Sequence, residues 1–142
     1  MFSNIKTLLV ITTVLSFFSP AALAENYSVI VHPSNNAPFD SGTVQRIFLS
    51  KEKTFSNGNP AIPIDIKPPS DQRENFREII IQKSASQIRS YWTMLVFSGK
   101  GAPPKEAASE KEVADLVAKK PNMIGYVSSS IVSPDVKVVL TF

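Results

Sequence analysis

The stretch AIPIDIKPPSDQRENF, residues 61–76, decides the fold because it joins a strand pattern to a helix start. Residues 61–66 resemble a strand, and two prolines and a run of polar residues follow. Asp71 then has Glu74 three positions later, which is the spacing of a capping box at the beginning of a helix. The stretch therefore predicts a strand that leads through a polar turn into a helix.

The strand in this stretch contains Pro63. Proline has no amide hydrogen to donate to a neighbouring strand, and it is found mainly where a strand is not fully paired. We expect this strand to lie at an edge of a sheet or to pair only in part.

Similar patterns extend in both directions along the chain. Strands are predicted for the short, apolar, β-branched segments at residues 27–32, 123–127 and 136–142. Helices are predicted where apolar residues return every three or four positions. These helix faces are Val44, Ile47 and Phe48; Phe76, Ile79 and Ile80 with Lys83; Ile88, Tyr91, Trp92, Leu95 and Val96; and Val113, Leu116 and Val117. The resulting order predicts an α/β domain, a small mixed sheet packed with helices.

Polar residues stand at the start of each predicted helix, where they can accept hydrogen bonds from unpaired backbone amides. Besides Asp71 with Glu74, they are Asp40 or Ser41, Ser84 with Gln87, and Ser109 with Glu112. Trp92 continues the apolar face of its helix without a gap, so we expect it to anchor the core rather than to stack on a ligand.

The first 24 residues have the pattern of an export signal. One positive charge at Lys6 precedes an uncharged, mostly apolar run, and a small-residue pattern ends at Ala24. The run is shorter than the roughly 20 apolar residues of a membrane-spanning helix. We expect cleavage after Ala24, which leaves residues 25–142 as one domain in the periplasm.

The composition limits the classes of partner. Without Lys6 the chain has 14 Lys and Arg against 12 Asp and Glu, a net charge of +2 with no dense basic run. This is too small a balance to indicate nucleic acid. An exported chain without cysteine has no disulfide and must be stabilised by packing.

Residues for catalysis and for metal or cofactor binding are scarce. His32 is the only histidine, and no dinucleotide or phosphate-loop glycine motif is present. One histidine with scattered carboxylates supplies neither a transition-metal cluster nor an assignable nucleophile and base. We therefore expect no enzyme activity, no metal and no cofactor; a hydrolase that uses His32 with a nearby serine is the weakest alternative.

The polar turn at Ser70, Asp71, Gln72 and Arg73 is the candidate ligand site. A helix start presents unpaired N–H groups and a partial positive charge to an anion, and an arginine can hold two oxygens at once. The competing interpretation is that the carboxylate of Asp71 caps the helix and occupies those same N–H groups.

The order of several segments resembles the phosphate-binding proteins of ABC transporters. The resemblance covers HPSNNAPFDSGTVQRIFLSKEKTFSNGNPAIPIDI, SDQRENF, YWTMLVFSGKGAPP and PNMIGYV, within about residues 29–127. It implies the fold of a type II periplasmic binding protein, which has two lobes with phosphate between them, and this chain resembles one lobe. It also implies that Ser70, Gln72 and Arg73 hold phosphate, whereas Asp71 stands where the family often has glycine.

The chain differs from the family in having one lobe and in having Asp71 where glycine is common, and these differences leave two functions open. The first is a non-catalytic module that binds phosphate or a related oxyanion weakly, or with a second chain completing the site and an ABC transporter as the receiver. The second is a protein-interaction module of the cell envelope that keeps the lobe fold without ligand binding.

Overall fold

The structure is a computed structural model that describes residues 25–142. The predicted export signal, residues 1–24, lies outside the described residues. No helix within residues 25–142 combines the length and the apolar character needed to cross a membrane.

Five strands form one mixed sheet in the order β3-β2-β4-β1-β5. The strands are β1 (Tyr27–Val31), β2 (Ile62–Ile66), β3 (Lys105–Ala107), β4 (Met123–Ser128) and β5 (Lys137–Thr141). Strand β2 runs parallel to β3 and β4, whereas β1 is antiparallel to β4 and β5. The predicted α/β class with a small mixed sheet is confirmed. Strand β3 was not predicted, because the sequence KEA has neither the β-branched residues nor the alternation of a strand.

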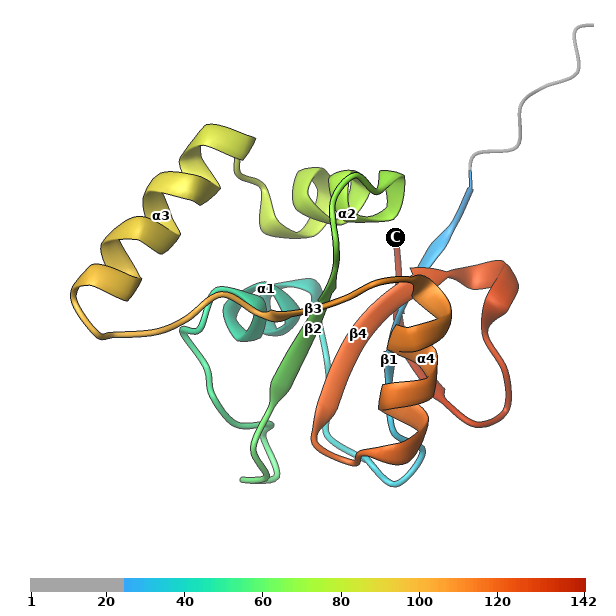
Figure 1. Ribbon diagram of the computed structural model, residues 1–142. Coiled ribbons are helices and arrows are strands. Elements are labelled where there is room, and N and C mark those ends of the chain that lie inside the picture. Colours follow the sequence, from blue (N-terminus) through green and yellow to red (C-terminus); the bar gives the residue numbers. More distant parts are fainter. Residues whose placement is uncertain (1–24) are drawn as a thin grey trace, which may run out of the picture.

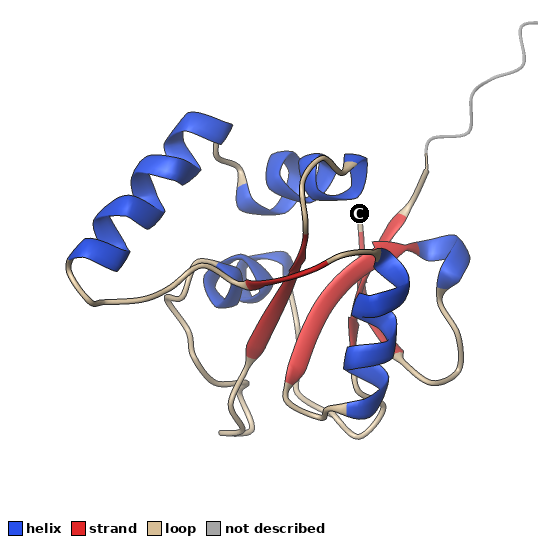
Figure 2. Ribbon diagram, viewed as in Figure 1, coloured by secondary structure: helices blue, strands red, loops and turns tan. Residues whose placement is uncertain are grey.

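Helices cover both faces of this sheet (Figures 1 and 2). They are α1 (Ser41–Phe48), α2 (Asp71–Phe76), α3 (Ala85–Phe97) and α4 (Glu110–Lys119), with the π-helical turn η1 (Arg77–Ile81) after α2 and the short 3-10 helix η2 (Ser129–Ile131) after β4. Helix α4 packs on one face of β4, while α1 and α2 pack on the other. Val44, Ile47 and Phe48 are buried, and the side chain of Asp40 accepts a hydrogen bond from Thr43 N–H, so the predicted face and cap of α1 are confirmed.

Pro63 divides the pairing of β2 along its length. Ile62 and Pro63 pair with β4, whereas pairing with β3 begins at Ile64. Since proline cannot donate to a ladder, pairing changes partner at this residue. The strand lies inside the sheet, so the edge alternative is wrong, and the expectation that it pairs only in part is confirmed.

An aromatic cluster fills the core between β4 and the helices α1 and α2. The rings of Phe76 and Tyr126 stack with centroids 4.1 Å apart, and Phe48 lies 4.6 Å from Phe76. All three side chains are buried. The cluster fixes α2 above the end of β2, and it thereby positions the polar turn that precedes α2.

The apolar face predicted for residues 76–83 is only partly correct. Phe76 and Ile80 are buried, but Ile79 is 48% exposed and Ile81 is buried in its place. The cause is the π-helical turn, in which Gln82 N–H bonds to the carbonyl of Arg77, five residues earlier. This wider turn rotates the inward face by about one residue relative to an α-helix.

Helix α3 projects from the body of the domain (Figure 1) and contains no buried residue. The predicted capping box is confirmed, because Ser84 and Gln87 bond reciprocally to each other's backbone N–H. The core role predicted for Trp92 is confirmed only in part: its side chain packs against the core but is only partly buried. The apolar residues predicted for one face of α3 do include those that face the core, but α3 contacts the body along that side only.

Candidate functional site

Ser70, rather than Asp71, is the N-cap of α2. Its hydroxyl oxygen accepts a hydrogen bond from Arg73 N–H at 3.1 Å, and its carbonyl accepts from Glu74 N–H. Asp71 occupies the first helical position with its side chain exposed to solvent. The capping box predicted for Asp71 and Glu74 is therefore not formed, and Ser70 caps the helix instead, since serine in extended backbone caps as well as aspartate does.

This cap leaves the first two amides of α2 without an acceptor among the described residues. The N–H groups of Asp71 and Gln72 make no hydrogen bond there, whereas those of Arg73 and Glu74 do. The Ser70 hydroxyl donates to the side-chain oxygen of Gln72 at 2.9 Å. The turn thus retains two free donors, and Asp71 does not occupy them.

The guanidinium of Arg73 is directed away from this turn. It donates to the carbonyl of Ile66 at 2.7 Å, bonds to the carboxylate of Glu106, and lies 3.5 Å from the carboxylate of Asp65. Burial lowers the pKa of Arg73, but these two carboxylates more than offset it and the pKa is raised. The prediction that Arg73 supplies a free cation at the turn is not supported by this geometry, because two acidic partners already neutralise it.

Asp65 and Tyr126 continue this network into the core. The hydroxyl of Tyr126 donates to the carboxylate of Asp65, and Ile66 N–H donates to the same oxygen at 2.8 Å. Burial raises the pKa of Asp65 above its ordinary value despite these bonds and the nearby Arg73. Burial, and then the charge of Asp65, also raises the pKa of Tyr126.

Asp65 and Glu106 were missed by reasoning from the sequence. A carboxylate inside the apolar run IPIDI is a sign of a buried polar partner, because such a charge must be paired when it is removed from water. Glu106 offers no comparable sign, since it lies on a strand too short to predict. The tertiary structure alone brings it to Arg73 across the pairing of β2 with β3.

A cavity of about 410 Å³ lies between α3 and the body, next to this network. Its apolar lining includes Phe48, Phe76, Ile88 and Trp92, and Arg73 and Glu106 lie at its polar side. This volume falls in the range of small-molecule sites. The sequence did not predict this cavity, which exists because α3 stands away from the sheet.

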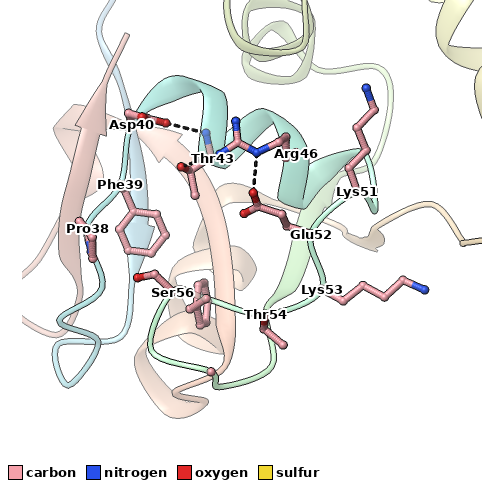
Figure 3. A pocket seen from close by; sticks show the side chains of 12 residues that line it. Pro38, Phe39, Asp40, Thr43, Arg46, Lys51, Glu52, Lys53, Thr54 and Ser56 are labelled. Carbon is pink, nitrogen blue, oxygen red and sulfur yellow. Dashed lines mark hydrogen bonds and ion pairs between the residues drawn. The ribbon is translucent and has the colours of Figure 1, made fainter.

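A second cavity, of about 760 Å³, lies at the start of α1 (Figure 3). Arg46 bonds to Glu52 at 2.5 Å, and Asp40 accepts from Thr43 N–H, so the charges near its centre are paired. Lys51 and Lys53 extend outward in Figure 3, and no ion pair is formed by either within residues 25–142. The cavity is open and mildly basic, and no residue predicted for the ligand site lines it.

His32 lies at the end of β1 in an exposed turn. Its Nδ1 atom is 2.7 Å from the hydroxyl of Ser34, and Ser34 N–H also points to Nδ1. No carboxylate orients the ring among the described residues, so this is the geometry of a local turn. No group of three His, Cys, Asp or Glu side chains in residues 25–142 is arranged to hold a metal ion.

The fold is similar to part of several solved proteins of phosphate transport. One match is a protein from Clostridium perfringens that is named as a phosphate ABC transporter substrate-binding protein and was solved with bound phosphate. It has a TM-score of 0.66 and 19% identity to this chain. An ABC-type phosphate transport receptor from Vibrio cholerae matches with a TM-score of 0.66 and 13% identity, and PstS from Borrelia burgdorferi with 0.54 and 12%. The predicted resemblance is thus confirmed at the level of the fold.

The match covers most of this chain but less than half of each larger protein. The first two comparisons cover 81% of this chain and 44% and 45% of the other chains, and the third covers 74% and 42%. No protein-family model matches the sequence, and no curated protein matches it significantly. The chain therefore shares the fold of part of these larger phosphate transport proteins.

Proposed function

We propose that the protein is an exported, non-catalytic binding module that holds phosphate or a related oxyanion at the start of α2. The observation that carries the proposal is the pair of free amides at Asp71 and Gln72, next to the hydroxyl of Ser70. Adjacent N–H groups at a helix start are suited to an anion. A structural neighbour with bound phosphate supports the choice of oxyanion.

The same geometry predicts weak binding. Arg73 is paired with Asp65 and Glu106, so the donors in the turn are uncharged. The exposed carboxylate of Asp71 also repels a phosphate, by about 1 kcal/mol per pair of unit charges at 4 Å in water. We expect a millimolar dissociation constant for the isolated chain.

Asp71 offers a matched pair of variants that separates its amide from its charge. Asp71→Ala keeps the N–H and removes the repulsion, so phosphate binding should tighten severalfold. Asp71→Pro also removes the charge, but it removes the N–H as well, and proline is well tolerated at the first helical position. The proline variant should therefore bind phosphate more weakly than the alanine variant by about tenfold.

The measurement is an NMR titration of backbone amides with phosphate, against chloride at equal ionic strength. The Gln72 amide should shift saturably, and sulfate in a parallel titration tests the selectivity between oxyanions. Saturating phosphate at ten times its dissociation constant should add about 1.4 kcal/mol to the free energy of unfolding. If Asp71→Ala and Asp71→Pro bind phosphate with equal affinity, the free amide of residue 71 does not contribute to the site.

Export and the completion of the cleft are parts of the same proposal. Residues 1–24 are proposed as a signal cleaved after Ala24, which leaves residues 25–142 as the mature domain. N-terminal sequencing of the protein from a periplasmic fraction should then begin at Glu25. A second chain or a transporter component is proposed to cover the side of the phosphate site that faces solvent. Sedimentation with and without phosphate would reveal ligand-dependent association of the chain with itself.

The interaction module remains a second candidate, and the exposed end of α3 favours it. Phe97 is 94% exposed and Met94 is 63% exposed, which is unusual for large apolar side chains. If this function is correct, Phe97→Ser abolishes recovery of a cross-linked envelope partner, and Asp71→Pro leaves it unchanged. The opposite pattern would assign the function to the α2 turn.

A further inference from the structure

The cavity beneath α3 is a compartment separate from the free amides of α2. Its lining includes Phe48, Phe76, Ile88 and Trp92, whereas neither Asp71 nor Gln72 lines it. Phe48 and Phe76 are buried parts of the core cluster, and Ile88 and Trp92 come from α3. One wall is thus rigid, and the other is a helix attached along one side.

The attachment of α3 leaves this apolar space unfilled. The hydroxyl of Tyr91 donates to the carbonyl of Leu49 at 2.5 Å, which ties the middle of α3 to the end of α1. Yet no residue of α3 is fully buried. An apolar molecule in the cavity would cover Ile88 and Trp92 and would join α3 to the core.

The charged side chains around the cavity determine which charge a bound molecule should carry. Arg73 is paired with Asp65 and Glu106, and Arg77 bonds to Glu74 at 2.8 Å. The guanidinium of Arg89, by contrast, makes no hydrogen bond or ion pair with any described residue.

Arg89 lines the cavity and comes from the same helix as Trp92. It is the cavity's unneutralised charge, and a guanidinium holds a carboxylate through two parallel hydrogen bonds. The complementary ligand has an apolar body and one negative group.

We propose that the cavity binds a small amphipathic carboxylate, whose apolar body contacts Trp92 and the Phe48 and Phe76 rings and whose carboxylate pairs with Arg89. The cavity of about 410 Å³ is large enough for a small molecule but not for a folded partner. This site goes beyond the proposed oxyanion function, because it selects for an apolar body that phosphate lacks.

Octanoate is the probe, with octanol and octylammonium as controls of equal chain length. Trp92 is the only tryptophan of the chain, so its fluorescence reports on the cavity directly. Octanoate should change the emission saturably, with octanol at least about fivefold weaker and octylammonium weaker still. Calorimetry gives the affinities independently, and the amides of α3 should exchange more slowly with octanoate bound.

Three variants locate the site. Arg89→Gln should weaken octanoate about tenfold and leave octanol unchanged, because a charge-assisted bond contributes more than a neutral one. Arg46→Gln removes an arginine from the distant cavity at α1, and Phe97→Ser removes an exposed apolar side chain outside this cavity; both should bind octanoate as the original chain does. Circular dichroism checks that α3 stays folded in each.

Several results would overturn the proposal. Equal binding of octanoate and octanol, or an unchanged affinity in Arg89→Gln, would remove the anion site. Loss of binding in Phe97→Ser would place the ligand on the outer surface of α3. A dimer in sedimentation that excludes octanoate would make a second copy of the chain the occupant. None of these results depends on phosphate, so the cavity site and the phosphate site at the start of α2 are tested independently.

Discussion

Gly125 lies in β4 beneath α4 and leaves no room for a side chain. A Cβ atom built there would lie 2.4 Å from Cγ1 of Val113, while Val117 and the carbonyl of Ile64 would stay at 3.7 Å. Carbon atoms normally approach to about 3.5–4.0 Å, so Gly125→Ala creates an overlap of more than 1 Å with one methyl group. The clash is confined to the packing of Val113 on the sheet.

Val113 cannot relieve this overlap easily. Its side chain is fully buried, and a valine in a helix strongly prefers one rotamer. Helix α4 must therefore move away from the sheet, and overpacking of this kind costs about 1–3 kcal/mol. We expect Gly125→Ala to cost about 2 kcal/mol, or roughly 8 °C in Tm for a domain of this size.

Urea unfolding followed by far-ultraviolet circular dichroism measures this cost, because Trp92 fluorescence reports on α3 instead of the core. Val113→Ala is the partner variant: alone it leaves a cavity and costs about 2 kcal/mol. The double variant should be more stable than the sum of the two losses predicts, by at least about 1 kcal/mol. Additive losses, or a loss below about 0.5 kcal/mol for Gly125→Ala, would refute the reasoning.

Two further predictions concern the buried network. Burial raises the pKa of Asp65 in the folded chain above the ordinary 3.8 of the unfolded chain. At pH values between these two pKa values, the folded chain binds a proton at Asp65 that the unfolded chain has lost, so the stability contributed by Asp65 falls as pH rises. The free energy of unfolding, original chain minus Asp65→Asn, should grow as pH is lowered from 7 toward 4; a flat or shrinking difference contradicts this assignment. Arg73→Met leaves the carboxylates of Asp65 and Glu106 without their cation and should cost about 1–2 kcal/mol by urea unfolding, after allowance for partial exposure. If Arg73 is a structural residue, this variant should change the phosphate affinity by less than about threefold; a tenfold loss would return Arg73 to the ligand site.

The local structure of the turn at residues 70–73 was predictable from the sequence, but the pairing of its arginine was not. The polar turn before α2 and its helix start follow from local residues, because caps depend on the sequence within one helical turn. Which residue caps the helix was wrong by one position, since Ser70 and Asp71 are both good caps. The direction of the Arg73 guanidinium was beyond local reasoning, because its partners Asp65 and Glu106 arrive from two strands.

The sequence by itself determined the α/β class, most strands and helices, the caps of α1 and α3, and the partial pairing at Pro63. These features depend on periodicity and on short-range hydrogen bonds, which adjacent residues encode. The tertiary structure decided the π-helical turn after α2, the pairing of the three-residue strand β3, and the neutralisation of Arg73. It also decided that α3 stands away from the core with Trp92 only partly buried. Each of these depends on contacts between segments far apart in the chain, and a local pattern cannot specify which distant surface a side chain will meet.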